Sequence, residues 1–409
     1  MFSKDLTQAK PNTIHFGHIL DKTSNLKSPT SNLKSPTSNL IDEVLVSVFR
    51  APHSYTGEDS VEISCHGSHY ILNKVLELLV QNGCRMAGPG EFTQRAFLNG
   101  KMDLSQAEAV ADLIASTNRA SHQLALSQLR GGISSELSKL RDQLLHLTSL
   151  LELELDFADH EELEFADRTE LLTLSRTIDR RVCHLANTFQ KGNALKNGIP
   201  VAIIGAPNVG KSTLLNALVG EERAIVSDIQ GTTRDAIEDS IQLRGITFRF
   251  IDTAGIRHTD DQIERLGIDR SLAATQQAKI IVMMTEPGVP YPDVPIREDQ
   301  TVIRIVNKTD DFQAKYGVGL DALRQRLIDT APKLPEGDVI VTSARHHEAL
   351  LHAHDSLTRV IDGLADQLPP DLVAEDLRLV LADLGEITGG TITSQETLQN
   401  IFSHFCIGK

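Results

Sequence analysis

A glycine-rich segment in the middle of the chain has the residue types that bind phosphate. Residues 205–212 (GAPNVGKS) fit the pattern G-x-x-x-x-G-K-[ST], between a predicted strand and a predicted helix. Glycines let backbone N–H groups curl around phosphate oxygens, and the start of a helix adds partial positive charge. We expect Lys211 to reach the β- and γ-phosphates of a nucleotide and Ser212 to bind Mg²⁺.

Two later loops have residues that suit the rest of a nucleotide. Residues 252–255 (DTAG) follow the predicted strand 248–251, where an Asp can hold Mg²⁺ through water and a Gly amide can meet the γ-phosphate. Residues 307–310 (NKTD) follow the predicted strand 302–306. The carboxylate of Asp310 can accept two hydrogen bonds from guanine N1 and its exocyclic amine, a pair that adenine does not offer. The sequence therefore predicts that the bound nucleotide is GTP.

A last loop completes the base side of the predicted site. Ser343 and Ala344 follow the predicted strand 339–341. All four elements follow strands, as expected where an open α/β sheet binds its ligand at the carboxyl ends of the strands. Their order and spacing are those of the translation-factor-like class of GTPases. Ile256 stands where Ras-like GTPases have the glutamine that orients water. An aliphatic side chain cannot orient water, so we expect another group to do so.

The chain as a whole divides into three structural units. The first two precede the GAPNVGKS loop. Residues 1–103 mix short strands at 44–49 and 60–64 with a helix at 70–80. They also contain the repeated exposed-loop sequence SNLKSPT within residues 22–40. Residues 104–197 have the spacing of long packed helices. The apolar seam of these helices consists of Leu126, Leu129, Ile133, Leu137, Leu140, Leu144, Leu147 and Leu151.

The third unit interrupts the helical one. Residues 198–364 alternate strands and helices as in a doubly wound sheet, and residues 365–409 are helical again. One face of the returning helix is apolar, with Leu372, Val373, Leu377, Val380, Leu381 and Leu384. We therefore predict a P-loop GTPase α/β domain inserted into an all-α domain.

Composition excludes several classes of protein. The 409 residues are 40% hydrophobic and 23% charged, the balance of a globular protein. The sequence has no apolar run of the roughly 18 residues that span a bilayer and no apolar signal core, so we expect a cytoplasmic protein. The four cysteines show no paired metal spacing, and we expect free thiols. The net charge of -15 argues against holding a polyanion by bulk attraction alone.

Over nearly its whole length the sequence resembles the MnmE (TrmE) family of tRNA-modification GTPases. The motifs that carry the resemblance are residues 54–59 (SYTGED), 65–67 (CHG), 88–93 (GPGEFT), 95–101 (RAFLNGK), 103–109 (DLSQAEA), 231–235 (GTTRD) and the terminal 405–409 (FCIGK). The resemblance implies a TrmE-type G domain that hydrolyses GTP with Mg²⁺ and with K⁺ in place of an arginine finger.

The resemblance also implies roles for individual residues. K⁺ would be bound by Asn208, Ser227, Ile229 and Thr232, and Mg²⁺ by Ser212 and Thr233. Glu264 would position the attacking water through a second water. The implied catalytic residues are Glu264, Lys211, Arg234 and Cys406. The implied nucleotide contacts are Asn208, Val209, Gly210, Lys211, Ser212, Thr213, Ser227, Asp228, Ile229, Gln230, Gly231, Thr232, Thr233, Asp252, Thr253, Ala254, Gly255, Asn307, Lys308, Asp310, Ser343 and Ala344.

For the first unit the resemblance implies a folate-binding α+β domain similar to the glycine-cleavage T protein. Glu62, Lys101 and Lys409 match positions that contact a tetrahydrofolate derivative, since a carboxylate suits the pterin donors and lysines suit the glutamate tail. Family members begin with a glycine-rich segment that contains a folate-contacting arginine. This chain has no such segment ahead of Pro11 and has the SNLKSPT repeat instead. We therefore expect a shortened domain, with altered folate binding and dimerisation.

The implied activity is modification at C5 of the tRNA wobble uridine (U34), as a carboxymethylaminomethyl or aminomethyl group. The implied partner is the MnmG flavoprotein, which brings FAD and NADH, in a heterotetramer with a homodimer of this chain. Because of the negative charge, we expect the flavoprotein to make most of the tRNA phosphate contacts. Two alternatives are a regulatory GTPase of the ribosome-assembly type, like Era and Der, and a GTPase that lost modification activity with its N-terminal segment.

Overall fold

The computed structural model describes most of the chain, in two compact units. The described residues are 1–21, 40–156, 168–221, 239–251, 273–332, 338–390, 398, 401–403 and 405. One unit consists of Met1–Ala107 together with Ile392–Lys409, and the other of Glu108–Thr391.

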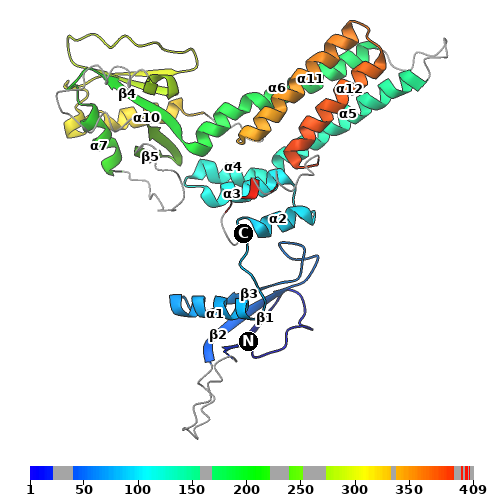
Figure 1. The fold of residues 1–409 in the computed structure, drawn as a ribbon. Coiled ribbons are helices and arrows are strands. Elements are labelled where there is room, and N and C mark those ends of the chain that lie inside the picture. Colours follow the sequence, from blue (N-terminus) through cyan, green and yellow to red (C-terminus); the bar gives the residue numbers. More distant parts are fainter. Residues whose placement is uncertain are drawn as a thin grey trace, which may run out of the picture. The chain divides into compact units, whose positions relative to one another are not determined.

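The first unit is built on a small antiparallel sheet. Its strands are β1 (Thr13–Leu20), β2 (Leu40–Phe49) and β3 (Ser60–Ser64), in the order β1-β2-β3. Helix α1 (His69–Gln81) packs on one face of this sheet (Figure 1), where its Val75 and Leu78 meet Ile19, Val44 and Val46. The predicted strands at 44–49 and 60–64 and the predicted helix at 70–80 are therefore confirmed. The SNLKSPT repeat lies outside the described residues.

The C-terminal residues of the chain pack within this first unit. Helix α2 (Glu91–Leu98) is followed by α3 (Leu104–Ala115). Leu104 and Ala107, at the start of α3, form an apolar cluster with Leu398 and Phe402. The ring of Phe402 lies 5.0 Å from that of Phe405, at the start of the FCIGK motif. Apolar contacts thus bring together parts of the chain that are about 300 residues apart in sequence.

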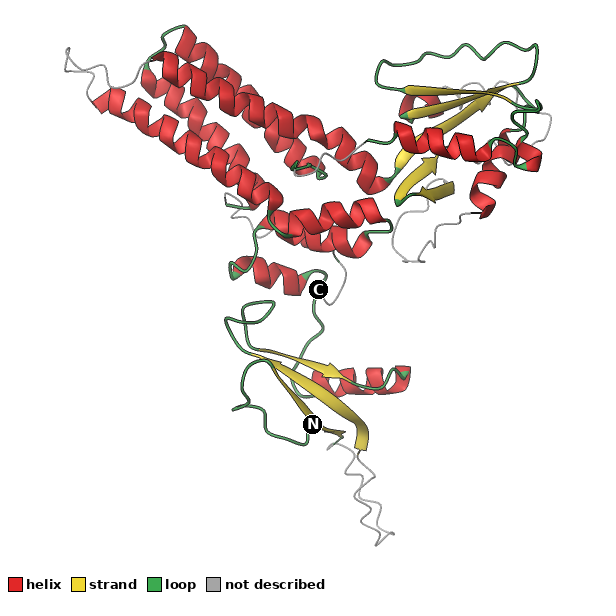
Figure 2. Cartoon of the chain, turned by 180° about the vertical axis from the view of Figure 1, so that it is seen from behind, coloured by secondary structure: helices red, strands yellow, loops and turns green. Residues whose placement is uncertain are grey.

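The second unit contains a bundle of long helices. They are α4 (Arg119–Leu129), α5 (Gly132–Asp156), α6 (Arg168–Asn197), α11 (Ala344–Ala365) and α12 (Pro370–Thr388). Figures 1 and 2 show α5, α6, α11 and α12 side by side, and they share one buried apolar cluster. Six of the predicted seam residues, Ile133, Leu137, Leu140, Leu144, Leu147 and Leu151, lie in it. The other two, Leu126 and Leu129 on α4, are half-buried and outside it. Helices that precede and follow the α/β part thus form one core, as an insertion requires.

Two details of the helical part differ from the sequence-based expectations. Residues 344–364, which the sequence assigned to the α/β domain, form α11, whose buried face packs on α6 and α12 in the helical cluster. Leu372 was predicted on the apolar face of the last helix but is 55% exposed, while Val373, Leu377, Val380 and Leu384 are buried. Leu372 lies beside, not on, the helical face formed by Val373, Leu377, Val380 and Leu384, which follow one another at steps of four, three and four residues.

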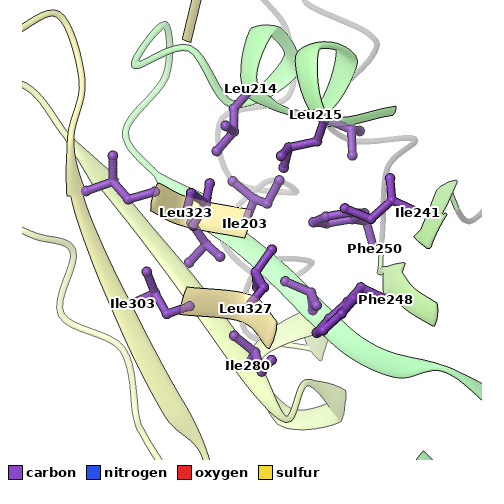
Figure 3. Packing of buried hydrophobic residues seen from close by; sticks show 14 of the residues in the cluster. Ile203, Leu214, Leu215, Ile241, Phe248, Phe250, Ile280, Ile303, Leu323 and Leu327 are labelled. Carbon is purple, nitrogen blue, oxygen red and sulfur yellow. The ribbon is translucent and has the colours of Figure 1, made fainter. Parts of the chain in front are cut away.

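The α/β part has a five-stranded sheet. Its elements are β4 (Ile199–Gly205), α7 (Lys211–Glu221), β5 (Asp239–Leu243), β6 (Ile246–Phe250), β7 (Ile280–Thr285), β8 (Thr301–Val306), the 3₁₀ turn η1 (Ala314–Tyr316) and α10 (Leu320–Thr330). The strand order is β5-β6-β4-β7-β8, with only the β5–β6 pair antiparallel. Figure 3 shows side chains of α7 and α10 packed on one face around Ile203 and Phe248. The carboxyl ends of β4, β7 and β8 therefore lie at one edge.

The predicted strand at 339–341 is wrong. Residues 338–343 form no strand in the structure. Side chains of two helices bind the segment instead. Thr188 Oγ1 accepts from Val341 N at 2.9 Å, and Gln128 Nε2 donates to Thr342 Oγ1 at 2.8 Å and to the carbonyl oxygen of Ile340 at 3.4 Å. Ile340 and Val341 are buried against the helical part rather than in the sheet. The apolar composition of the segment suits burial but does not specify the partner.

Candidate nucleotide site

The GAPNVGKS loop joins the end of β4 to the start of α7. Asn208 and Gly210 have positive φ angles of 61° and 100°. Asn and Gly are the residues that adopt such angles at least cost. Left-handed residues within a loop turn successive backbone N–H groups toward a common side, which produces an anion-binding concavity. The local sequence therefore explains why the chain leaves β4 in a tight loop and enters α7 with its N–H groups unused by the helix.

Two glycines of this loop allow close packing against neighbouring strands. A Cβ atom on Gly205 would lie 2.6 Å from the carbonyl oxygen of Met284 on β7. A Cβ atom on Gly210 would lie 2.5 Å from Nδ2 of Asn307, directly after β8. Both separations are shorter than carbon contacts permit, so only glycine fits at either position. The loop is thereby held at the edge of the sheet where the strands end.

Lys211 folds over this loop. Its Nζ donates to the carbonyl oxygens of Gly205 at 2.8 Å and Ala206 at 2.9 Å. Burial lowers the pKa of Lys211 from its ordinary value. A phosphate beside the ammonium would oppose that shift, because an opposite charge favours the protonated form. The contact of Lys211 with phosphate stays a prediction.

Asn307 ties the base-side loop to the phosphate-side loop. Its side chain is buried, and its Nδ2 donates to the carbonyl oxygen of Val209 at 2.7 Å. Its Oδ1 accepts from the backbone N–H of Ala314 at 3.1 Å. A buried hydrogen bond contributes about 1 kcal/mol, and losing one partner costs more because the other stays unsatisfied. The NKTD loop is therefore fixed to the GAPNVGKS loop through one amide.

Of the remaining NKTD residues, Lys308 and Asp310 are exposed and Thr309 is half-buried. Lys308 has φ 63° and forms an ion pair with Glu286, Nζ to Oε1 at 2.5 Å. Thr309 Oγ1 accepts from Phe312 N at 3.2 Å, which closes the turn that contains Asp310. The side chain of Asp310 is exposed. Its carboxylate is thus free of burial and accessible to a base.

The other predicted site residues either adjoin the helical part or lie outside the described residues. Ser343 precedes α11, and the segment before it binds the helical part. The residues Ser227, Asp228, Ile229, Gln230, Gly231, Thr232, Thr233, Arg234, Asp252, Thr253, Ala254, Gly255, Ile256, Glu264, Cys406 and Lys409 lie outside the described residues.

Two of the three predicted folate contacts are described, in the first unit. Glu62 is exposed on β3, opposite Ser47 of β2. Lys101 Nζ donates to the carbonyl oxygen of Pro52 at 2.8 Å. The folate assignment stays a prediction, because these contacts do not join Glu62 and Lys101 to one another.

Sequence analysis missed a charged network built from the motif residues of the first unit. Glu91 Oε1 accepts from Arg85 Nη2 at 2.6 Å and from Arg95 Nη2 at 2.7 Å. Arg95 also donates to Glu58 at 2.9 Å. The hydrogen bonds from Arg85, the backbone of Gly88 and Arg95 lower the pKa of Glu91 to about 2. The one sequence signal for this network is that Glu58, Glu91 and Arg95 all lie in motifs that carry the family resemblance.

Comparison with known proteins identifies the family. A family model described as the MnmE helical domain matches residues 104–406, and one described as the GTP-binding protein TrmE N-terminus matches residues 1–101. A tRNA modification GTPase MnmE of Phocaeicola vulgatus is 52% identical, over 99% of this chain and 91% of the relative.

The chain belongs to the MnmE family. Members from Parabacteroides distasonis and Flavobacterium johnsoniae, both also named tRNA modification GTPase MnmE, are 50% and 47% identical over 99% and 100% of this chain and 91% of each relative. The predicted family resemblance and the prediction of a GTP-hydrolysing enzyme are therefore confirmed. A structure of Era in complex with MgGDPNP and a 16S ribosomal RNA segment matches 38% of this chain and 66% of its own at 23% identity, with a TM-score of 0.23.

Among the described helices, none combines the length and apolarity needed to cross a membrane.

Proposed function

We propose that this MnmE-family chain hydrolyses GTP in a K⁺-dependent reaction and uses the hydrolysis cycle to modify C5 of the tRNA wobble uridine. The observation that carries the proposal is the amide of Asn307, which fastens the base-reading loop to the phosphate loop through Val209. This tie sets the distance between the guanine end and the phosphate end of one bound nucleotide. A GTP site needs both ends fixed in this way.

The base end of the site would be read by Asp310. Its exposed carboxylate can accept from both N1 and the exocyclic amine of guanine. Lys308, held by Glu286, would lie along the base. Ser343 and Ala344 would complete the base contacts.

The phosphate end would combine backbone N–H groups with two cations. The loop suits a phosphate because its left-handed residues Asn208 and Gly210 turn backbone N–H groups toward one side. Ser212 and Thr233 would bind Mg²⁺. Asn208, Ser227, Ile229 and Thr232 would bind K⁺. Both cations would neutralise charge that develops between the β- and γ-phosphates.

The attacking water would be positioned by Glu264, because Ile256 cannot orient it. Lys211 would stabilise negative charge on the phosphates. Arg234, which directly follows Thr233 in the sequence, would be a further catalytic residue. In this arrangement a carboxylate holds the water in line while the cations and Lys211 stabilise the leaving group.

One hairpin links the nucleotide end to the helical part. Strands β5 and β6 connect the segments that contain Thr233 and Asp252, and their turn at Gly245 accepts from the backbone N–H of Ala120 at 3.1 Å. Asn118, the N-cap of α4, donates to Thr247 Oγ1 at 2.9 Å. We infer that changes in the two nucleotide-contacting segments reach α4 through this hairpin.

The modification step would need partners. The MnmG flavoprotein would bring FAD and NADH, a tetrahydrofolate derivative bound near Glu62, Lys101 and Lys409 would supply the one-carbon unit, and Cys406 would take part in the chemistry. A homodimer of this chain would form a heterotetramer with MnmG in the cytoplasm. The net charge of -15 leaves most tRNA phosphate contacts to the flavoprotein.

The proposal is tested by mass spectrometry of wobble uridines in a strain that lacks its own MnmE and carries this chain. We expect restored modification with the natural chain and none with Lys211→Ala, which keeps the fold but loses the phosphate contact. Equal modification with both chains would contradict the role of GTP. Absence of modification with both, alongside intact GTP hydrolysis by the purified natural chain, would instead favour a GTPase without modification activity.

A further inference from the structure

Three side chains of different chemistry meet on the helical bundle, away from the nucleotide site. Asp179 and Cys183 are four residues apart on α6 and therefore lie on one face of that helix. His354 comes from α11, which packs beside α6. Their ligand atoms, a carboxylate oxygen, a thiol sulfur and an imidazole nitrogen, all lie within 4.8 Å of one another.

The separations approach those around a tetrahedral cation. Cys183 Sγ lies 3.2 Å from His354 Nδ1 and 3.9 Å from Asp179 Oδ1, and Nδ1 lies 2.6 Å from Oδ1. With bonds of about 2.0–2.3 Å to nitrogen, oxygen and sulfur, the ligand atoms of a tetrahedral Zn²⁺ stand about 3.4–3.6 Å apart. The N–O pair must open by roughly 0.8 Å, and the S–N and S–O pairs must change by roughly 0.3 Å each, which side-chain rotation can supply.

The alternative of a catalytic thiol does not suit this geometry. In a Cys–His–Asp relay the thiol and the carboxylate bind opposite ring nitrogens, so that the ring passes a proton between them. Here both contact the same nitrogen, Nδ1 of His354.

We propose that Asp179, Cys183 and His354 bind one divalent cation of the Zn²⁺ type. A thiolate, an imidazole and a carboxylate together are ligands for Zn²⁺ or Co²⁺ rather than for Mg²⁺ or Ca²⁺, which prefer oxygen. His354 is 36% exposed and Asp179 18% exposed, so the fourth position opens to water. Binding displaces the thiol proton to solvent and forms the sulfur–metal bond.

Such a cation would link α6 and α11, the two helices that flank the α/β insertion in the sequence. Helix α6 ends at Asn197, directly before β4, and α11 begins at Ala344, directly after the α/β insertion. A metal between them would join the helix that leads into the insertion to the helix that follows it. The inference does not depend on the proposed GTPase reaction.

The test is a titration of the untagged full chain, without nucleotide, with Co²⁺ and then Zn²⁺. We expect one equivalent of Co²⁺ to give a thiolate-to-cobalt charge-transfer band with tetrahedral d–d bands, and one equivalent of Zn²⁺ to abolish them. Cys183→Ser should remove the charge-transfer band. His354→Gln should weaken Co²⁺ binding by at least about 100-fold, since removing even a group that only hydrogen-bonds to a metal ligand lowers metal affinity by about 10–100-fold. Cys84→Ser, at an exposed free cysteine, is the matched control and should bind as the natural chain does.

A second measurement separates metal binding from loss of fold. Zn²⁺ should raise the melting temperature of the natural chain and of Cys84→Ser but leave that of Cys183→Ser unchanged. The absence of a thiolate band in the natural chain overturns the proposal. A band that survives Cys183→Ser, or Co²⁺ affinity unaffected by His354→Gln, overturns it as well.

Discussion

Replacing Glu108 by Gln should destabilise the helical part, because Glu108 balances two basic side chains inside it. Its Oε1 accepts from Arg345 Nε at 2.8 Å, and its Oε2 lies 2.9 Å from His346 Nε2. His346 is 1% exposed and Glu108 19%. Arg345 also donates to the carbonyl oxygen of Ile387 at 2.9 Å, in the last turn of α12. One carboxylate thus links α3, α11 and α12.

The pKa of Glu108 gives the magnitude. Burial raises this pKa, but the contact with His346 and the charges of His346 and Arg345 outweigh burial and lower it from 4.5 to about 2. At about 1.4 kcal/mol per pH unit, the shift corresponds to about 3 kcal/mol of unfolding free energy. Breaking one side of a buried ion pair costs a similar 3–5 kcal/mol. Because the folded pKa is depressed, the stabilisation is complete above pH 4.5 and is lost as the pH falls toward 2.

Urea unfolding followed by far-ultraviolet circular dichroism measures this effect. We expect Glu108→Gln to unfold with about 3 kcal/mol less free energy than the natural chain at pH 7 and about 2 kcal/mol less at pH 3.5. Glu375→Gln is the control, because Glu375 pairs with Arg378 at the exposed surface of α12 and should change stability by less than about 0.5 kcal/mol. A Glu108→Gln chain as stable as the control at pH 7, or a difference that does not shrink in acid, would refute the reasoning.

Three further predictions concern the nucleotide site. Gly210→Ala should weaken GTP binding by about 10–100-fold in a fluorescent-nucleotide titration. The added Cβ would lie 2.5 Å from Asn307 Nδ2, and the φ of 100° is strained for Ala. Unchanged affinity would mean that the loop is not held as described. Asp310→Asn should weaken GTP binding by roughly 100-fold and admit xanthosine nucleotides, because it removes one charge-assisted pair of hydrogen bonds; retained guanine selectivity would contradict its role. Glu264→Ala should bind GTP normally but hydrolyse it roughly 10²–10⁴-fold more slowly in single-turnover assays; normal turnover would remove its assignment.

Local patterns predicted most of the elements that carry the site. The 3.6-residue spacing from Ile133 to Leu151 predicted the buried face of α5, and all six of its residues are in the bundle core. The GAPNVGKS motif predicted a tight loop between a strand and a helix, and Gly210 in it has a positive φ angle, which glycine adopts at least cost. Such signals lie within a few residues of one another, where backbone sterics and helix geometry act directly.

Features that depend on distant partners could not be predicted in this way. The apolar run Val339–Val341 has the composition of a strand, but Thr188 and Gln128 of the helical part take its backbone hydrogen bonds. Cys183 meets His354 across 171 positions of sequence, so the spacing of the cysteines alone gave no sign of a cation site. The Asn307 amide binds Val209, 98 positions away, and the motif indicated the residue but not this bond.

The central claim is that the loops joined by Asn307 form the GTP site of a K⁺-dependent hydrolase. The most direct measurement is the steady-state rate of GTP hydrolysis by the full chain with Mg²⁺, in K⁺ and in Na⁺ at equal ionic strength, with Lys211→Ala as the inactive control. The account predicts hydrolysis that is at least about tenfold faster in K⁺ and is abolished by Lys211→Ala in both salts. Equal rates in K⁺ and Na⁺, or hydrolysis that persists in Lys211→Ala, would contradict it.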